Sequence, residues 1–513
     1  MSNDNKYKNQ LENCYKIIGA SDSSSKIVLL KGGSYKIKQY YLEDNVPRDI
    51  RGASMNLAYV EEKVIPNCIE KHFSRDCIMY NGGGNIFCIL PESVDENFAM
   101  ELENEAEKYL VSANTAYVTL CITRGEFEND YKEVIRELER KLSSRKKLKI
   151  FNPIISESAF APQGFMDWND STIKLSNEKC EPTSCQLCKS RIASYIYEDK
   201  KVCASCMHKA AVGKSSRKDY LEEYKKRVGK DAVVCDSFTD IDSDHIAVVY
   251  GDGNNMGQII RNFKFITDMM KFSDEVKEAA TGSVYDTMKF LGIDRFEVVG
   301  LGGDDIFVIV SGKVALKFAT GLIKEYNNKF KKQNVAENEN MYESTMSVGV
   351  CIAKSNTPLR IMLEVAEDKL AEAKELAKLN NTKGKDTGTI SYAVLDDPTE
   401  TTESSETLYH LKSTLAPYTT EGMDNLIEYI EKLKRNKNAK SALRNIYDAY
   451  TNSDCLEEAY LFFNYRNAKD KKMKIYAPEI DGWENKNGKY SRNGTEAFVW
   501  RDILELYNYV EEN

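Results

Sequence analysis

The most constraining feature of the sequence is the segment FEVVGLGGDDIFVIVSG, residues 296–312. Two runs rich in β-branched apolar residues flank a short glycine-containing turn, and this pattern predicts a β-hairpin. Gly302 and Gly303 can take the positive φ that a two-residue hairpin turn needs. Asp304 and Asp305 follow them, and adjacent carboxylates repel each other unless a cation lies close by. Taken alone, this stretch is explained equally well by a turn that uses aspartate as a turn former.

Length and charge bound what the chain can be. A length of 513 residues exceeds one hydrophobic core and predicts three or four units. The net charge of −9 predicts no general affinity for nucleic acid. The polar start lacks the apolar stretch of a signal peptide, and no apolar run approaches the length of a membrane span. We therefore expect a cytoplasmic chain whose scattered cysteines are reduced.

One order of elements occurs twice along the chain. Residues 26–142 and 245–395 each have the pattern of strand, helix, β-hairpin, helix and strand, which is the order of a ferredoxin-like fold. The sequence therefore predicts an α+β protein with an internal duplication. The boundaries we expect are a first ferredoxin-like domain at 1–165, a cysteine-rich module at 166–240, a second ferredoxin-like domain at 241–397 and a C-terminal helical domain at 398–513.

The two predicted hairpins differ in charge. When they are aligned through the Ile-Phe pair that follows each turn, the glycines of the two turns coincide. Gly84 and Asn85 of the first hairpin then stand where the second hairpin has Asp304 and Asp305. We therefore expect metal chemistry only in the second copy.

Asp252 directly follows the predicted strand 245–250, in the sequence GDGNNMG. A ferredoxin-like sheet places its first strand beside its hairpin, so Asp252 would face Asp304 and Asp305. Three convergent carboxylates suit two magnesium or manganese ions, and such a pair suits displacement at phosphorus. The alternative for Asp252 alone is an Asx-type turn. The glycines that would let the backbone approach a triphosphate are Gly253, Gly257, Gly302 and Gly303.

Two Cys-x-x-Cys pairs, Cys185 with Cys188 and Cys203 with Cys206, are fourteen residues apart. This spacing in a chain without export signals predicts tetrahedral zinc. Cys180 or His208 could replace one ligand. A site closed by four thiolates has no open position for chemistry, so we expect a structural role.

Lys374 and Lys378 lie one turn apart on the predicted helix 359–378, and both flank its apolar stripe. They could reach polyphosphate oxygens along the sheet edge. An ordinary solvated helix face explains them more simply.

Six motifs occur in order along about residues 25–395: RGAS (Arg51–Ser54), YNGGGN (Tyr80–Asn85), the two Cys-x-x-Cys pairs, GDGNNMG, GGDD, and the block from Ser347 to Lys374. Together they resemble the large polymerase/cyclase subunit of type III CRISPR effector complexes. The last three are also similar to the GGDEF nucleotide-cyclase palm.

The resemblance implies two palm domains around a zinc module, with a helical C-terminal domain. It implies synthesis of cyclic oligoadenylate from ATP, with the metal ions bound by Asp252, Asp304 and Asp305 and a second ATP at the first palm. It also implies other effector subunits, and guide and target RNA through them. The residues assigned to the nucleotide are Gly253, Asn254, Asn255, Gly302, Gly303, Lys374 and Lys378.

The sequence departs from the family pattern in two places. It has no histidine-aspartate dipeptide of the nuclease domain that family members often carry, so cleavage of single-stranded DNA is not expected. Asn254 stands where a further carboxylate is common. Three alternatives stay open: a stand-alone palm cyclase with a different cyclic product, a catalytically silent scaffold that binds nucleotide, and a diguanylate cyclase.

Overall fold

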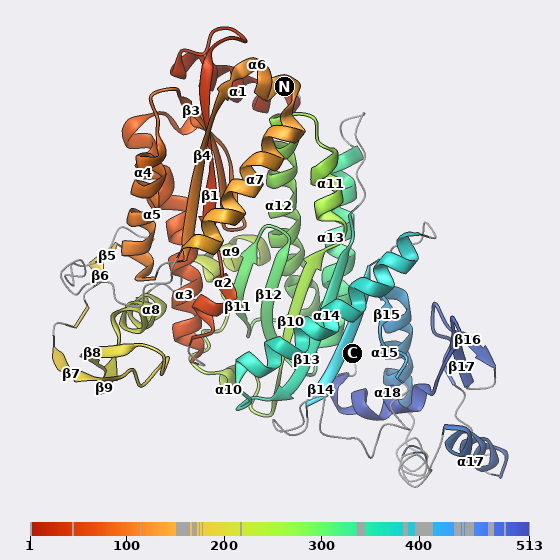
Figure 1. Cartoon of the computed structure of the whole chain (residues 1–513). Helices are drawn as coiled ribbons and strands as arrows, with labels where there is room; N and C mark the ends of the chain where they lie inside the picture. The colour runs from red at the N-terminus through yellow and green to blue at the C-terminus, as the bar shows by residue number, and fades with distance from the viewer. Residues whose placement is uncertain are drawn as a thin grey trace. The chain divides into compact units, whose positions relative to one another are not determined.

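Figure 1 shows the computed structural model of the whole chain. Within the predicted C-terminal helical domain, residues 398–413 and most of 436–455 lie outside the described residues. The structure describes residues 3–43, 46–112, 114–149, 165–166, 172–173, 175–176, 178–215, 218–335, 344–382, 388–395, 414–435, 443, 446, 456–469, 477–486 and 489–511.

The chain divides into two compact units. The first comprises Met1–Lys230, Asn255–Ala280 and Val298–Asp305, and the second comprises Asp231–Asn254, Thr281–Glu297 and Ile306–Asn513. The four domain boundaries predicted from the sequence stay predictions. No helix in the described part of the chain is long and apolar enough to cross a membrane.

The first unit contains a four-stranded antiparallel sheet with the order β2-β3-β1-β4. This is the strand order of a ferredoxin-like sheet, with the first strand at its centre. In the central strand β1, the apolar residues Ile27, Val28, Leu29 and Leu30 are fully buried. Helix α7 crosses the sheet and packs on β1 and β4 (Figure 1). The strands are β1 (Lys26–Ser34), β2 (Ile78–Gly82), β3 (Asn85–Pro91) and β4 (Thr115–Thr123). The helices are α1 (Asn3–Ile18), α2 (Ile37–Tyr41), α3 (Pro47–Tyr59), the π-helix η1 (Val60–Val64), α4 (Ile65–His72), the 3-10 helix η2 (Arg75–Cys77), α5 (Glu96–Leu110), α6 (Arg124–Asn129) and α7 (Tyr131–Leu148).

The cysteine-rich segment forms a small three-stranded sheet next to two helices. It is tied to the residues before α3 by Glu43, which accepts hydrogen bonds from Arg191 at 2.6 Å and from Lys209 at 2.5 Å. These side chains are almost fully buried, and buried charges are tolerated only when they are paired in this way. The elements are the ribbon β5 (Phe165–Met166) and β6 (Thr172–Ile173), the sheet β7 (Lys179–Ser184), β8 (Ile192–Tyr197) and β9 (Lys200–Val202), and the helices α8 (Ala204–Ser215) and α9 (Lys218–Val228).

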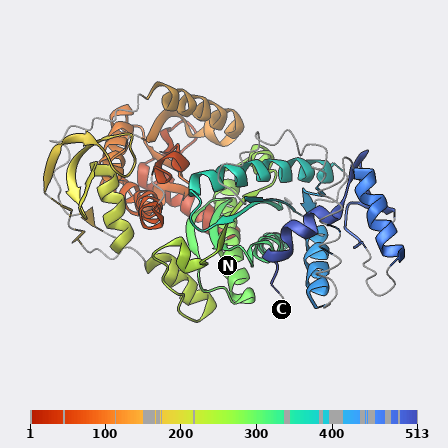
Figure 2. The ribbon, with the colours of Figure 1, turned by 90° about the horizontal axis from the view of Figure 1, so that it is seen from below.

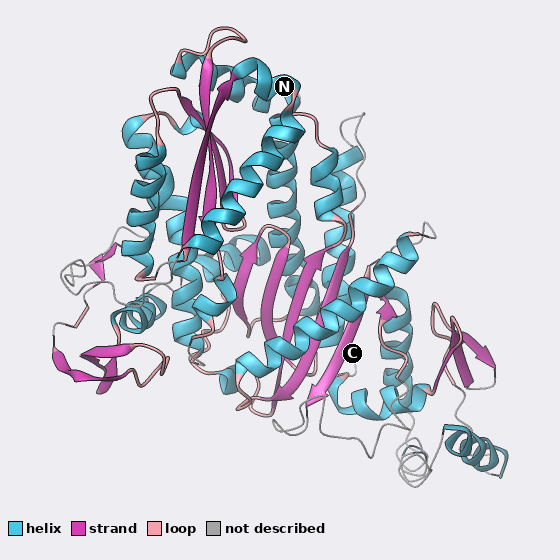
Figure 3. Ribbon diagram, viewed as in Figure 1, coloured by secondary structure: helices cyan, strands magenta, loops and turns pink. Residues whose placement is uncertain are grey.

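A six-stranded sheet has the order β11-β12-β10-β13-β14-β15. Its first four strands repeat the order of the sheet in the first unit. Helix α14 covers one face of β13 and β14, and α13 packs on the other face (Figures 1 and 2). The strands are β10 (His245–Gly253), β11 (Glu297–Gly302), β12 (Asp305–Ser311), β13 (Met346–Lys354), β14 (Thr389–Leu395) and β15 (Tyr418–Thr419). The helices are α10 (Phe238–Ile241), α11 (Met256–Asn262), α12 (Ile266–Leu291), α13 (Ala315–Val335) and α14 (Leu359–Asn381). Figure 3 shows the same elements coloured by secondary structure.

The C-terminal region is mixed, whereas the sequence predicted a helical domain. Strand β15 extends the six-stranded sheet by pairing with β14, and a separate three-stranded sheet follows it. Helix α18 is fixed by the buried Asp502, which accepts hydrogen bonds from the Tyr392 hydroxyl at 2.5 Å and the Leu415 N–H at 2.9 Å. The elements are α15 (Thr420–Arg435), α17 (Leu456–Lys469), β16 (Glu484–Lys486), β17 (Lys489–Arg492), β18 (Thr495–Ala497), α18 (Val499–Leu506) and the 3-10 helix η4 (Tyr507–Tyr509).

Helix α14 approaches β13 closely because Gly349 has no side chain. A Cβ at this position would overlap the carbonyl oxygen of Ala366, and neither backbone can move aside easily. We expect Gly349→Ala to lower the free energy of unfolding by roughly 1–3 kcal/mol or more, as overpacking does. Urea unfolding measures this loss. The control is Gly257→Ala, whose Cβ would meet only the Arg261 Nη1 at 4.0 Å. Equal stability of the two variants would contradict the close packing.

Candidate active site and metal centre

The first predicted site residue, Asp252, lies in β10, directly after the buried strand residue Gly251. Its side chain is 24% exposed and therefore open to a ligand. Lys374 of α14 donates a hydrogen bond to the Asp252 carboxylate and forms an ion pair with it. The structure thus brings together two residues that the sequence separates by more than one hundred positions.

The turn of the GGDD hairpin lies one residue later than predicted. The turn residues are Gly303 and Asp304, whereas Gly302 ends β11 and Asp305 begins β12. Gly303 has a φ of 62°, which only glycine adopts readily. Glycine and aspartate are both common turn residues, so the residue types at 302–304 do not decide which two of them form the turn.

The pairing of β10 with β12 places the predicted carboxylates Asp252 and Asp305 each next to a paired residue. Gly251 pairs with Ile306, Asp252 follows Gly251, and Asp305 precedes Ile306. Carboxylate oxygens are the ligands that magnesium and manganese prefer, so the donor chemistry fits such ions. The metal role of Asp252, Asp304 and Asp305 stays a prediction.

Asn254 is almost fully buried and is part of the fold. Its side chain accepts a hydrogen bond from the Ser347 hydroxyl at 2.8 Å and donates one to the Thr345 hydroxyl at 2.9 Å. The amide therefore holds the end of β10 to the start of β13, a role that the sequence analysis missed. Asn255 has a left-handed φ of 63° and precedes α11. The nucleotide contacts predicted for Gly253, Asn254 and Asn255 stay predictions.

The two predicted lysines of α14 differ in their surroundings. Lys374 is partly buried against Asp252, whereas Lys378, one turn later, is exposed. The structure therefore places Lys374 at the end of β10. The predicted nucleotide roles of Lys374, Lys378, Gly302 and Gly303 are not tested by these contacts.

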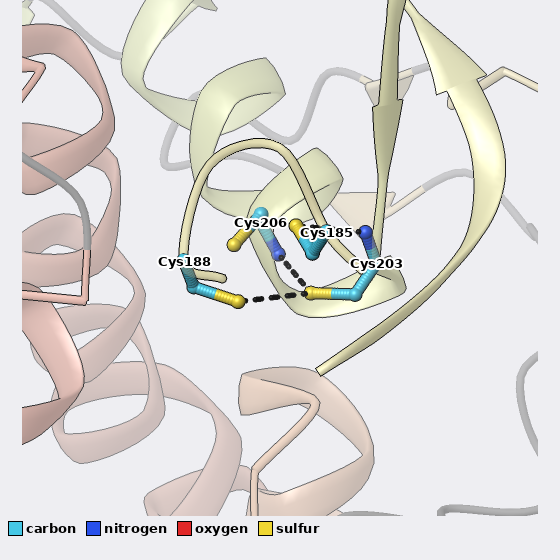
Figure 4. A group of neighbouring side chains, drawn as sticks. All are labelled: Cys185, Cys188, Cys203 and Cys206. Atoms are coloured by element: carbon cyan, nitrogen blue, oxygen red, sulfur yellow. Dashed lines mark hydrogen bonds between the residues drawn. The ribbon is translucent and has the colours of Figure 1, made fainter. Parts of the chain in front are cut away.

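The four predicted zinc ligands form one cluster (Figure 4). The Sγ atoms of Cys185, Cys188, Cys203 and Cys206 all lie within 4.8 Å of one another. Backbone N–H groups point at the sulfurs, from Cys203 to Cys185 at 3.3 Å and from Cys206 to Cys203 at 3.5 Å. Such bonds stabilise thiolates, so the cluster could hold a tetrahedral zinc ion. Among the described residues it is the one group of three or more metal-ligating side chains that lie this close together.

The two alternative zinc ligands lie outside this cluster. The Cys180 thiol donates to the Tyr195 carbonyl at 3.6 Å. His208 is fully buried, its Nδ1 lies 3.5 Å from the Asn56 side-chain nitrogen, and burial lowers the pKa of His208 to about 3. The four cysteines of the two Cys-x-x-Cys pairs are therefore the better ligand set.

One family model matches most of the six-stranded sheet, and solved structures are similar to most of the chain. Residues 245–384 match the family model of the Cas10/Cmr2 second palm domain. No curated protein matches the chain. Among solved structures, the chain is similar to a Csm1-Csm4 cassette in complex with pppApApA, with a TM-score of 0.58 and 14% identity over 90% of this chain and 68% of that chain.

Two further Csm1-Csm4 cassettes are similar to the chain. The complex with cA4 has a TM-score of 0.53 and 13% identity over 87% of this chain and 66% of that chain. The complex with AMPPNP has a TM-score of 0.54 and 14% identity over 87% and 66%. The chain thus spans about two thirds of the length of these proteins, and identities this low show a shared fold. The match at 245–384 therefore makes these residues similar to the second palm domain of the Cas10/Cmr2 family.

Proposed function

We propose that the protein is a metal-dependent nucleotidyltransferase that converts ATP to cyclic oligoadenylate and releases pyrophosphate. The observation that carries this proposal is the end of β10, where Asp252 and Lys374 meet beside the start of the β12 strand that follows the GGDD turn. The match to the Cas10/Cmr2 second palm supports it, as do the fold matches to Csm1-Csm4 cassettes crystallised with cA4 and with pppApApA.

Each residue of the site has a distinct part in the proposed reaction. Asp252, Asp304 and Asp305 hold the divalent cations, which supply charge stabilisation at phosphorus and acidify the attacking 3′-hydroxyl. Lys374, with Lys378, holds the triphosphate and stabilises the negative charge of the departing pyrophosphate. The backbone at Gly302 and Gly303 leaves room for phosphate oxygens. The first palm, whose hairpin has Gly84 in the turn and Asn85 at the start of β3, binds the second ATP as the acceptor.

The partners we propose are the other subunits of a type III CRISPR effector. The similar Csm1 chains are crystallised with Csm4, which supports a protein partner of this kind. The net charge of −9 gives the chain as a whole no attraction to phosphate, so RNA would be held mainly by those subunits.

Product analysis tests the proposed function. The purified chain, alone and with its co-purified partners, is incubated with ATP or GTP and with Mg²⁺ or Mn²⁺, and the products are identified by mass spectrometry. We expect cyclic oligoadenylate from ATP. A cyclic dinucleotide from GTP would indicate a diguanylate cyclase, and no product under any condition would indicate a nucleotide-binding scaffold.

Lys374→Ala is expected to reduce the rate of product formation roughly 10²-fold, as loss of one preorganised charge at the reacting phosphates does. Its matched control is Lys369→Ala on the same helix, because Lys369 pairs with Glu372 at 2.7 Å and not with the site. Initial rates of pyrophosphate release measure both variants. Equal rates for Lys374→Ala and Lys369→Ala would contradict the assignment.

A further inference from the structure

Glu61 is hydrogen-bonded to the β2–β3 hairpin of the first palm. It lies in the π-helix η1, between α3 and α4, and such one-turn insertions are frequent at functional sites. The Gly84 N–H donates a hydrogen bond to the Glu61 carboxylate at 2.7 Å. The side chain of Asn81 donates to the Glu61 carbonyl at 2.6 Å. Both the side chain and the backbone of Glu61 are therefore bonded to the β2–β3 hairpin.

The turn that Glu61 holds is in contact with the GGDD turn. A Cβ on Gly83 would lie 3.4 Å from the Cα and N atoms of Gly303. A Cβ on Gly302 would in turn lie 3.6 Å from the Cα of Gly83. The atoms that either added Cβ would meet belong to the backbone, so no side chain separates the two turns.

We propose that Glu61 is a positioning residue whose ionised carboxylate holds the Gly83–Gly84 turn against Gly302 and Gly303, so that its protonation slows nucleotidyl transfer at the GGDD turn. This inference rests on the proposed function. Glu61 itself contacts no reacting atom. It acts through the hydrogen bond to Gly84 and the backbone contact that follows.

The charges around Glu61 set the pH range of the effect. Burial raises the pKa of Glu61 to about 7, against the lowering effects of the Gly84 and Gly83 N–H groups and of Lys277 on α12. Glu62 raises it further, and Lys277 forms an ion pair with Glu62 at 3.0 Å. Tyr117 of β4 faces the same small cavity, which Ser34, Asn81 and Asn85 also line.

The sign of the pH effect differs between activity and stability. Above a pH of about 7 the carboxylate is ionised and accepts the strong, charge-assisted hydrogen bond, so activity rises with pH. The raised pKa means that the folded state holds this proton longer than the unfolded state. The Glu61 contribution to the free energy of unfolding is therefore present at low pH and is lost as pH rises through about 7.

The test compares pH profiles of pyrophosphate release. For the wild type we expect a rise with a midpoint near pH 7, because the pKa of Glu61 is raised to about 7. Glu61→Gln should lack this rise and stay roughly tenfold or more below the wild-type plateau, as a misplaced reacting group does. Lys277→Met should move the midpoint to higher pH, since Lys277 lowers the pKa of Glu61. Superimposable profiles for the wild type and Glu61→Gln would overturn the proposal.

One further measurement keeps the test independent of activity. Hydrogen–deuterium exchange of peptides covering 78–91 and 297–311 should increase in both hairpins in Glu61→Gln. The control variant Glu92→Gln removes only the exposed ion pair with Lys26 and should change the exchange rate of neither hairpin. Faster exchange in the first hairpin alone would overturn the coupling. If neither the wild type nor any variant makes product, the proposed function fails. The exchange result alone then decides the role of Glu61.

Discussion

Replacing Asp304 and Asp305 together by alanine is expected to reduce product formation by roughly 10³-fold or more. The two carboxylates are proposed to hold cations whose charge stabilisation is worth several kcal/mol, and each 1.4 kcal/mol is a factor of ten in rate. Asp304 lies in the turn and Asp305 is exposed at the start of β12, so neither contributes to the hydrophobic core. We therefore expect the double variant to remain folded. Product yield and circular dichroism measure the two effects.

The matched control for this double variant is Asp368→Asn. Asp368 is an exposed carboxylate on α14, so its loss changes the net charge without touching either turn. It should leave the rate within a factor of about two, because an isolated surface charge contributes little. A double variant as active as Asp368→Asn would reject the role of the GGDD carboxylates.

The second large effect is expected at the cysteine cluster. Cys203→Ser should lose bound zinc and lower the free energy of unfolding of this segment by several kcal/mol. Structural zinc contributes on the order of 10 kcal/mol of folding free energy in small domains, and this segment has only short strands and a small core. Thermal unfolding and the zinc content by elemental analysis measure both consequences. A chelator should produce the same change in the wild type.

Cys180→Ser is the control within the same segment, since the Cys180 thiol lies outside the cluster and donates only a weak hydrogen bond to Tyr195. It should keep one zinc ion per chain and nearly the wild-type melting temperature. Retention of zinc by Cys203→Ser, or its loss from Cys180→Ser, would show that the four clustered cysteines are not the ligand set.

The strands of both ferredoxin-like sheets were predictable from sequence. Their buried strands are continuous apolar runs, and each glycine turn is followed by the same Ile-Phe pair, so strand identity and hairpin alignment follow from pattern alone. The predicted position of the GGDD turn was wrong by one residue: Gly302 is the last residue of β11, and Gly303 and Asp304 form the turn, because the register of the strands rather than the glycine pair decides where the hairpin turns.

The sheets of the C-terminal region were not predicted. The hairpin β17–β18 turns at Asn493 and Gly494, which both have positive φ, and an Asn-Gly pair is the strongest short signal for such a turn. This signal was present in the sequence. Strand β15 has only two residues and gains its order from pairing with β14, so no local pattern could reveal it.

The residues of the candidate sites also divide into those that the sequence predicts and those that it does not. The paired cysteines were found by spacing, because their ligand geometry is local. The partners of Asn254 and Asp252, and the hold of Glu61 on Gly84, join residues that are 23 or more positions apart. Such contacts depend on how the strands and helices pack, and no periodic pattern in the sequence indicates them.

The most direct test of the shared metal site is anomalous diffraction from crystals that contain Mn²⁺ and a non-hydrolysable ATP analogue. We expect manganese peaks bounded by the carboxylates of Asp252, Asp304 and Asp305, and we expect them to be absent from crystals of Asp252→Asn. Manganese bound elsewhere, with no peak among these three side chains, would contradict the proposed enzyme.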